Sequence, residues 1–500
     1  MATESRETEK KYDFEPGARR PSLRGLPQVS QEDDLDEQTL EADYYDTAGL
    51  HLIRAGVTLR RRRGGHDQGW HLKLPLDGDS RREIRLPLGR ASRRVPAELA
   101  VLVRAHARGE ALQPVAQVTT TRRRRALLDD EGGSLAEVMT DDVSARTMGE
   151  SMTLTRWREL EVELTGGGPH LLRAADKRLR QSGLRPAGHS AKLERALADQ
   201  LPAPGREPGL TRRSAAADVV LAYARSQAAV LPALDPMIRR DEPGSVHDMR
   251  VATRRLRSTL KSFGKILGTP GADQLRAELK WLGGVLGEAR DNEVLAPHLH
   301  ARLARLPAEL LVGPVQARVT AYFAPRSASA RTALLEALDS ERFIALLNGL
   351  DQYLSVPPPA ADARQAAEDV LPAVVRHARR RVRRRARRAG LAPAGQAREN
   401  ALHESRKAAK DARYAAEAAG LTGGKQARRT ARRMKKAQAM LGDQHDAVVA
   451  RDTARDIGMR AYLAGENAFS FGLLHERCQY DALALAEQVA KTWPSMFRPS

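Results

Sequence analysis

Residues 158–164 read RELEVEL, a stretch in which glutamate alternates strictly with leucine or valine. Successive side chains of a β-strand point to opposite faces, so the pattern predicts a strand with one carboxylate face and one apolar face. At the N-terminus, residues 6–13 read RETEKKYD and place Glu7, Glu9 and Lys11 together on one face of another strand. Five segments between these two also place charged residues in phase on one face, and they are VTLRRRR (57–63), WHLKL (70–74), RREIRL (81–86), TTTRRRRAL (119–127) and LAEVMTDD (135–142).

The charged faces of these seven segments differ in sign, since some offer mainly glutamate and others mainly arginine and lysine. One charged face alone is ordinarily a solvated surface. Seven of them favour a closed barrel with a charged lumen and an apolar outside covered by helices. Such a lumen suits a highly anionic ligand that arrives with Mg²⁺ or Mn²⁺, because carboxylates hold the metal and basic groups neutralise phosphate oxygens. No Ser/His/Asp or Cys/His arrangement and no Walker-type loop is evident, so a covalent intermediate is not suggested.

Composition limits the class of protein. The chain has 500 residues, of which 41% are apolar and 4% aromatic, so it can build hydrophobic cores. Its one cysteine, Cys478, excludes a disulfide framework and favours a reducing compartment. The N-terminal segment lacks the apolar region of a secretion signal, and no stretch has the length of a membrane span. We therefore expect a cytoplasmic protein that does not bind membranes.

The chain changes character at residues 201–211, LPAPGREPGLT, which we interpret as a linker between a β-rich domain (1–200) and a helical domain (212–490). Residues 1–200 contain 34 basic and 32 acidic side chains, whereas residues 201–500 contain 49 and 31, a net charge of +18. The second part should attract a polyanion. The stretch SVPPPAADA (355–363) divides it into repeats of about 212–355 and 364–490.

An internal repeat supports this division. Residues 247–261, HDMRVATRRLRSTLK, match residues 403–417, HESRKAAKDARYAAE, at an offset of 156. Residues 279–291, LKWLGGVLGEARD, match residues 434–446, MKKAQAMLGDQHD, at an offset of 155. The same motif order at nearly the same offset predicts a duplicated helical bundle with about four helices in each half.

Each repeat carries a cationic stripe at helical spacing. One such stripe is ordinarily a solvated surface, but like charges on one helix face repel, so a stripe kept in both halves suggests a compensating anion. The residues of the stripes and of the matching second motif are His247, Arg250, Arg254, Arg257, Lys261 and Lys280, and His403, Arg406, Lys407, Lys410, Arg413 and Lys435. We further predict that the arginine run 376–388 is a helix that continues this basic surface.

The β-rich part resembles the CYTH domain, the family of triphosphate tunnel metalloenzymes. Glu7-x-Glu9-x-Lys11 is similar to its ExExK signature, and YYDT with Asp46, the strands described above and Ser190-x-Lys192 follow in the family's order. The resemblance covers about residues 4–200. It implies a tunnel of eight antiparallel strands, with catalytic residues Glu7, Glu9 and Lys11, metal ligands Glu7, Glu9, Glu161 and Glu163, and triphosphate-binding residues Arg60, Arg62, Lys73, Arg122, Arg124 and Lys192. Which of Glu159, Glu161 and Glu163 contact metal stays open, and the runs Arg60–Arg63 and Arg122–Arg125 are ambiguous by one residue.

The helical part, about residues 212–490, resembles the CHAD domain, the conserved histidine α-helical domain, through its repeated HxxxR pattern and the later LG…D element. This resemblance implies binding of inorganic polyphosphate by the two stripes. His445 stands where the first repeat has Arg290, so the two halves are expected to contribute unequally.

Together these observations predict an α+β protein, with a tunnel of eight antiparallel strands and flanking helices followed by two repeated four-helix bundles. The leading hypothesis is metal-dependent hydrolysis of tripolyphosphate or a related triphosphate, with polyphosphate held by the helical domain, in the cytoplasm and associated with polyphosphate granules. One alternative is a non-catalytic polyphosphate-binding protein with a weak or inactive tunnel. Another is a nucleic-acid-binding protein, which the low aromatic content disfavours. The sequence leaves the exact substrate, the preferred metal and the oligomeric state open.

Overall fold

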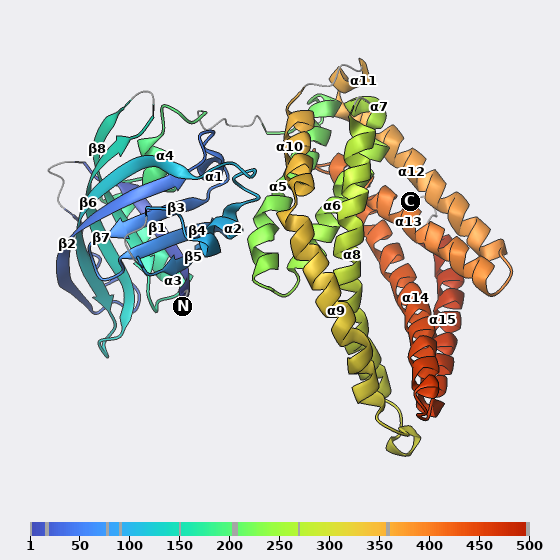
Figure 1. Ribbon diagram of the computed structural model, residues 1–500. Coiled ribbons are helices and arrows are strands. Elements are labelled where there is room, and N and C mark those ends of the chain that lie inside the picture. The colour runs from blue at the N-terminus through green and yellow to red at the C-terminus, as the bar shows by residue number, and fades with distance from the viewer. Residues whose placement is uncertain are drawn as a thin grey trace. The chain divides into compact units, whose positions relative to one another are not determined.

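The computed structural model describes residues 3–15, 20–76, 80–89, 93–149, 152–202, 209–268, 271–356 and 361–496 (Figure 1). The chain divides into two compact units, Met1–Glu207 and Pro208–Ser500, and each is described by itself. Among the described residues, no helix is long and apolar enough to cross a membrane.

The first unit is built around one antiparallel sheet (Figure 1). Its strands are β1 (Thr3–Asp13), β2 (Gln31–Asp46), β3 (Thr58–Arg63), β4 (Gly69–Pro75), β5 (Ser80–Leu86), β6 (Gln113–Leu128), β7 (Ser134–Thr147), β8 (Leu154–Leu164) and the short β9 (Arg185–Pro186). The strand order is β5-β4-β3-β2-β6-β7-β8-β1, and β1 also pairs with β5, so eight strands close into a barrel. β9 pairs with β1 beside this closed ring. The predicted tunnel of eight antiparallel strands is confirmed.

The apolar faces of the strands point outward and are covered by helices. Tyr12, Leu160 and Val162 pack in one cluster with residues of α3 (Pro169–Gln181). On other parts of the barrel, Trp70, Leu72 and Ile84 pack with residues of α2 (Ala97–Val103). The short helices α1 (His51–Arg54) and α4 (Lys192–Ala196) contribute to the remaining outer core. Because the outside holds the hydrophobic core, the charged faces of the strands are left for the lumen.

The second unit is helical. Its helices are α5 (Ala216–Arg239), α6 (Ser245–Ser262), α7 (Gly264–Leu267), α8 (Ala272–Leu303), η1 (Ala308–Leu310), α9 (Val315–Asp339), α10 (Glu341–Ser355), α11 (Ala361–Arg364), α12 (Ala367–Leu391), α13 (Gln396–Ala419), α14 (Lys425–Leu463) and α15 (Phe469–Met496). The arginine run 376–388 lies within α12, as predicted. The α+β fold class is therefore confirmed.

The internal repeat is visible in the packing. In the first half, α5, α6, α8 and α9 pack each against the next, and α12, α13, α14 and α15 do the same in the second half. Ala215 and Ala366, just before the first helix of each half, form an antiparallel bridge. Its hydrogen bonds are reciprocal, since the N–H of Ala216 donates to Gln365 at 2.8 Å and that of Ala367 donates to Ser214 at 2.9 Å. The halves also meet where α6 packs against α13, which brings the two predicted stripes together.

Candidate functional site

Charged side chains from most strands of the barrel and from α4 line one cavity inside it. The acidic members are Glu7, Glu9, Asp67, Glu83, Glu161 and Glu163, and the basic members are Lys11, Arg60, Arg62, Lys73, Arg81, Arg85, Arg122 and Lys192. All sequence-predicted tunnel residues belong to this set except Arg124. That residue lies two positions further along β6, where it pairs with Glu137 at 2.8 Å and with Asp36 at 3.4 Å.

The structure shows which arginines of β3 face the lumen. Arg60 and Arg62 line the cavity. Arg61 lies 4.0 Å from Asp43, and Arg63 lies 3.8 Å from the same carboxylate, so these two side chains are on the other face of the sheet. The β3–β4 pairing explains why Arg61 points away from the lumen. Arg61 stands directly opposite Trp70, whose side chain belongs to the outer core.

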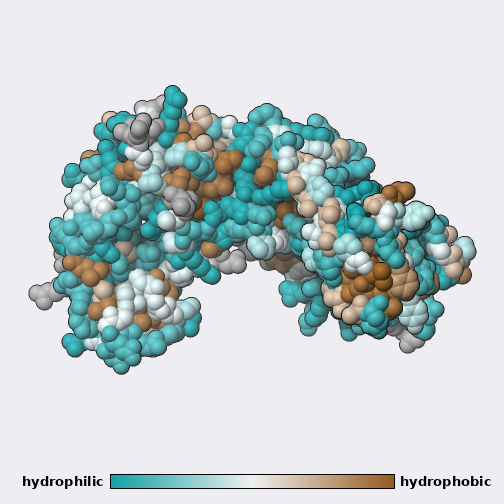
Figure 2. All heavy atoms as spheres, turned by 60° about the horizontal axis from the view of Figure 1, so that its bottom comes forward, coloured by the Kyte–Doolittle hydropathy of each residue, from teal (hydrophilic) through white to brown (hydrophobic). Residues whose placement is uncertain are grey.

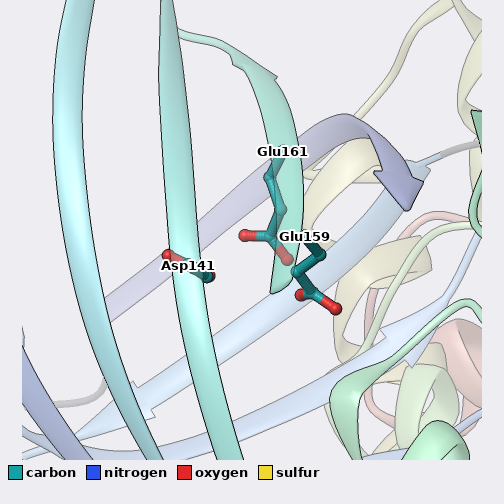
Figure 3. A group of neighbouring side chains, drawn as sticks. All are labelled: Asp141, Glu159 and Glu161. Atoms are coloured by element: carbon teal, nitrogen blue, oxygen red, sulfur yellow. The ribbon is translucent and has the colours of Figure 1, made fainter. Parts of the chain in front are cut away.

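One group of carboxylates is formed by Asp141 on β7 and by Glu159 and Glu161 on β8 (Figure 3). Their oxygens lie within 4.8 Å of one another, which is close enough to hold a metal ion. The ammonium of Lys192 lies 2.8, 2.6 and 2.8 Å from the three carboxylates, in that order. A metal ion here would have to compete with a buried lysine.

A second group of carboxylates comprises Glu7, Glu9 and Glu163. Glu9 and Glu163 are direct partners across the β1–β8 pair. Within the described residues, Glu163 has no ion pair, and burial together with the charges of Glu7 and Glu9 raises its pKa to about 7. Burial also raises the pKa of Glu7. Glu163 is therefore the carboxylate of this group that could bind a hard divalent cation such as Mg²⁺ or Mn²⁺ without displacing a lysine, whereas Glu7 pairs with Lys73 and Glu9 with Lys11.

The tunnel cations contact carboxylates. Lys11 pairs with Glu161 and, at 3.2 Å, with Glu9, while Lys73 lies 2.5 Å from Glu7. Arg122 makes two hydrogen bonds to Asp141 at 2.8 and 2.6 Å. A divalent cation on Glu7 and Glu9 would weaken the hold of these two carboxylates on Lys73 and Lys11, which could then also contact phosphate oxygens, although Lys11 keeps its pair with Glu161.

The cationic residues of the helical unit meet where α6 crosses α13. Arg250 and Arg254 of α6 act electrostatically on Arg406 and Lys410 of α13. Burial, then the neighbouring arginines, lowers the pKa of Lys410 to about 7. Burial also lowers the pKa of Arg254 and Arg406, and the buried Nε of each has no hydrogen-bond partner. We call these four half-buried residues the cationic crossing; two of them, Arg254 and Arg406, have an Nε without a partner among the described residues, whereas Arg250 pairs with Asp291 at 2.9 Å.

Comparison with known proteins finds a matching domain family for the barrel unit and for the helical unit. The CYTH domain matches residues 5–192, and the CHAD domain matches residues 222–455. Two relatives, the uncharacterized proteins MT2285 and Rv2226 of Mycobacterium tuberculosis, are each 36% identical over 484 residues, covering 94% of this chain and 92% of theirs.

The chain belongs to the CYTH and CHAD domain families.

Solved structures resemble parts of the chain. PptA from Streptomyces chartreusis is 23% identical with a TM-score of 0.48, and the match covers 56% of this chain and 99% of PptA. The CHAD domain from the plant Ricinus communis is 25% identical with a TM-score of 0.41, covering 58% of this chain and 92% of that one. A Hippeastrum adenylyl cyclase, described as having a dominant triphosphatase activity, is 16% identical with a TM-score of 0.23, covering 39% and 98%.

The remaining stripe residues of the CHAD unit are outside the cationic crossing. Lys261 pairs with Asp411 at 3.0 Å, Arg413 with Glu417 at 2.7 Å, and Lys407 with Glu404 of its own helix at 2.9 Å. These three cations are already neutralised. His247, Lys280 and Lys435 are exposed, Arg257 is half-buried, and the ring of His403 lies 4.9 Å from that of His445.

The repeated glycines of the CHAD unit lie beside the arginines of the two HxxxR elements. A Cβ at Gly287 of α8 would lie 3.4 Å from the guanidinium of Arg250, and one at Gly442 of α14 would lie 3.9 Å from that of Arg406. The LG element of each repeat thus lies next to the HxxxR element of the same repeat.

Sequence reasoning missed several residues of the CYTH unit. Arg81, Glu83 and Arg85 line the tunnel, and the alternation in RREIRL had placed them on one face, although the resemblance assigned them no role. Glu83 is fully buried and contacts His71 at 2.8 Å, and burial lowers the pKa of His71 to about 3. Asp141 shares a strand face with Glu137 in LAEVMTDD, and this alternation could have indicated that Asp141 faces the lumen. Asp67 comes from a loop and gave no signal.

Proposed function

We propose that the CYTH unit hydrolyses inorganic tripolyphosphate or a related triphosphate in a metal-dependent reaction, and that the CHAD unit binds inorganic polyphosphate. The observation that carries the proposal is the closed barrel itself, in which the carboxylates Glu7, Glu9 and Glu163 share one lumen with many lysines and arginines. A lumen of this kind attracts both a divalent cation and a phosphate chain.

In this proposal Glu7, Glu9 and Glu163 would hold the metal, with Glu161 shared between it and Lys11. A bound Mg²⁺ or Mn²⁺ would neutralise phosphate charge and lower the pKa of a bound water. Lys11, Lys73 and Arg122 then bind phosphate oxygens and hold the chain along the lumen. Arg60, which donates a hydrogen bond to Tyr44 at 3.3 Å, is held toward the same space. Fixing the chain with its terminal phosphorus aligned with the attacking water is the main contribution of these side chains.

In the CHAD unit, the cationic crossing would hold successive phosphates of a polyphosphate chain. Its four cations come from two helices, so a ligand must carry closely spaced negative charges to contact them all. Arginine pairs with phosphate oxygens through two hydrogen bonds, and lysine acts as a point charge. We expect nucleic acid to be a poor specific ligand, and we expect the protein to be cytoplasmic and to associate with polyphosphate granules.

One observation favours the alternative of a polyphosphate-binding protein with a weak or inactive tunnel. Lys192 contacts all three carboxylates of the Asp141, Glu159 and Glu161 group, and lysines also hold Glu7 and Glu9, so a metal ion would have to displace an ammonium group at either place. A reaction that needed a metal ion at both groups would then be slow.

The deciding experiment is a phosphate-release assay over tripolyphosphate, nucleoside triphosphates and long-chain polyphosphate, each with Mg²⁺, with Mn²⁺ and with a chelator. We expect release from a short triphosphate only when a metal is present, and unchanged polyphosphate binding when the metal is removed. Absence of release from every substrate, with polyphosphate binding intact, would establish the non-catalytic alternative.

The register of β3 gives a second prediction. Arg62→Ala and Lys11→Ala should each lower kcat/KM by ~10–150-fold, because each removes a charge-assisted contact of roughly 1.5–3 kcal/mol. Arg61→Ala is the matched control, since this side chain pairs with Asp43 on the opposite face, and it should stay within a few-fold of wild type. The measurement is kcat/KM for tripolyphosphate from steady-state kinetics of the three variants and the wild type. An effect of Arg61→Ala as large as that of Arg62→Ala would refute the assigned face.

The lowered pKa of Lys410 predicts a pH dependence. Lys410 titrates at about 7, so its charge is present below that pH and is lost above it. Polyphosphate binding should therefore strengthen by about tenfold as the pH falls from about 8.5 to about 6, with uptake of a proton. Lys410→Arg keeps the charge throughout this range and should flatten the profile, as measured by titration calorimetry in buffers of different ionisation enthalpy. An unchanged profile in this variant would exclude Lys410 as the titrating group.

A further inference from the structure

Asp67 is an acidic loop residue whose carboxylate faces inward. Hydrophilic residues cover most of the molecular face shown in Figure 2, so an acidic loop residue as such indicates no function. Asp67, however, lines the lumen cavity and pairs with Arg62, which is only 4% exposed. It is therefore placed where a phosphate group of a bound ligand would also find its cation.

The carboxylate on Arg62 differs from those that hold the other cations of the lumen. Lys73, for example, pairs with Glu7 of β1, which is 5% exposed and fixed on a strand. Among the described residues Arg62 has one ion pair, and its partner Asp67 belongs to the loop between β3 and β4. The side chain of Asp67 is 37% exposed, so water can solvate the carboxylate when it leaves the guanidinium. Displacing this carboxylate is less costly than displacing a buried one.

The backbone of the loop is held in place although the carboxylate is exposed. Gly64 has a φ of +81°, and a Cβ there would clash with the carbonyl oxygen of Thr39 on β2, so the loop needs glycine to lie against the barrel. The ring of His71 contacts the carbonyl oxygen of Asp67 at 2.8 Å. The carboxylate can therefore leave Arg62 by rotation of its side chain alone, a motion of picoseconds to nanoseconds for exposed residues.

The surroundings of Arg62 favour a bound anion. Burial, together with the charges of Arg60 and Arg122, lowers the pKa of Arg62 to about 8. Its Nε has no hydrogen-bond partner among the described residues. A buried guanidinium beside two others is stabilised by an anion within reach, and Asp67 supplies that anion from the chain itself.

We propose that Asp67 is an intramolecular competitor for the phosphate site at Arg62. It pairs with the guanidinium in the empty lumen, a triphosphate displaces it, and it returns to Arg62 as the product leaves. The inference rests on the proposed function, because it concerns triphosphate in the lumen. It goes further by giving Asp67 an effect opposite to that of the carboxylates that would hold the metal, since Asp67 weakens the binding of every phosphate ligand that contacts Arg62.

This competition affects substrate and product differently in practice. A competitor on the same chain acts at a high effective concentration, because it cannot diffuse away. The penalty applies to both ligands, but a triphosphate can offset it through contacts to Lys11, Lys73 and Arg122, whereas a shorter product makes fewer contacts. Asp67 thus sets the affinity for substrate and keeps product from occupying the lumen.

Asp67→Asn tests the proposal, because it keeps the size of the side chain and removes its charge. KM for tripolyphosphate and Ki for pyrophosphate, the probe for a product, should both fall about tenfold. This is the lower end of the range for a charge-assisted contact, as expected for a partly exposed carboxylate. kcat should not rise, since the substitution acts on binding. The measurement is phosphate release by the full chain with Mg²⁺ over a range of both ligands.

Two controls test whether the effect depends on Arg62. In an Arg62→Ala background, Asp67→Asn should change neither constant by more than about twofold. Asp43→Asn is the matched control, because it removes the same charge from a residue that lies 4.0 Å from Arg61 on the other face of β3, and it should leave both constants unchanged. Asp67→Ala is a second variant that should reproduce the gain, and a thermal melt of each variant shows whether the barrel is intact.

Opposite results would overturn the proposal. A KM that rises in both Asp67→Asn and Asp67→Ala would show that Asp67 supports the phosphate site instead of competing for it. An equal fall in the Arg62→Ala background, or in Asp43→Asn, would show a general effect of net charge. A wild-type protein that releases phosphate from no triphosphate would overturn the proposed function and this inference together. Release by the wild type, with KM and Ki unchanged in Asp67→Asn, would overturn this inference alone.

Discussion

Replacing Arg250, Arg254, Arg406 and Lys410 together with alanine is expected to abolish polyphosphate binding, with a loss of at least ~1,000-fold. Each residue can supply a charge-assisted contact of roughly 1.5–3 kcal/mol, and the four act on one ligand. They sit at half-buried positions where α6 crosses α13, so they can contact one ligand together. Titration of long-chain polyphosphate against the full chain at fixed salt measures the loss.

The matched control for this variant is Arg376→Ala, Arg380→Ala, Arg384→Ala and Arg388→Ala, which removes the same four charges from exposed positions along α12. If binding depended only on the net charge of the helical part, both variants would lose affinity equally, and modestly. If the α12 variant lost binding while the first variant kept it, the arginine run would be the polyphosphate site and the cationic crossing would not.

Glu9→Gln is expected to lower turnover of tripolyphosphate by about 100-fold or more, because it removes a carboxylate charge from the group that would hold the metal. Substitution of a residue that only contacts a metal ligand typically lowers metal affinity or activity by about 10–100-fold, so loss of a ligand itself should have at least this effect. Glu41→Gln is the matched control, since Glu41 is exposed and pairs with Arg63 outside the lumen. The measurement is phosphate release over a range of Mg²⁺ and Mn²⁺ concentrations.

The way in which the turnover of Glu9→Gln depends on metal concentration decides what the substitution has removed. A variant whose turnover recovers at high metal concentration has lost metal affinity, as the proposal requires. Turnover within a few-fold of wild type, with the metal requirement unchanged, would remove Glu9 from the metal site. A thermal melt of each variant shows whether the barrel is intact.

Much of the barrel could be predicted because alternation reports directly on the two faces of a strand. RELEVEL and RETEKKYD gave the correct faces, since charged and apolar residues alternate in them. The run Arg60–Arg63 has no such contrast, because four residues of one type look the same in either register. Its register is fixed by pairing, which places Arg61 opposite Trp70 and Arg60 opposite His71.

The details of the site depend on contacts that local patterns do not encode. Lys192 belongs to the short helix α4 and reaches Asp141 and Glu159 only because the chain returns to the barrel after β8. In the CHAD unit, helical spacing predicted two cationic stripes, but not which of their residues are paired with carboxylates. The structure shows that Lys261 faces Asp411 of the other repeat, so this cation is neutralised by a residue 150 positions away.

The cationic crossing also has a thermodynamic consequence for the fold that contains it. The pKa of Lys410 is lower in the folded chain than in the unfolded one, so its charge opposes folding. This opposition is fully present below about pH 7 and fades as the pH rises toward the ordinary pKa of lysine. An anion that binds only the folded chain adds stability that grows with its concentration relative to Kd. If polyphosphate is this anion, as we propose, it stabilises the packing of α6 against α13, and the melting temperature of the helical unit should rise with the amount that is bound.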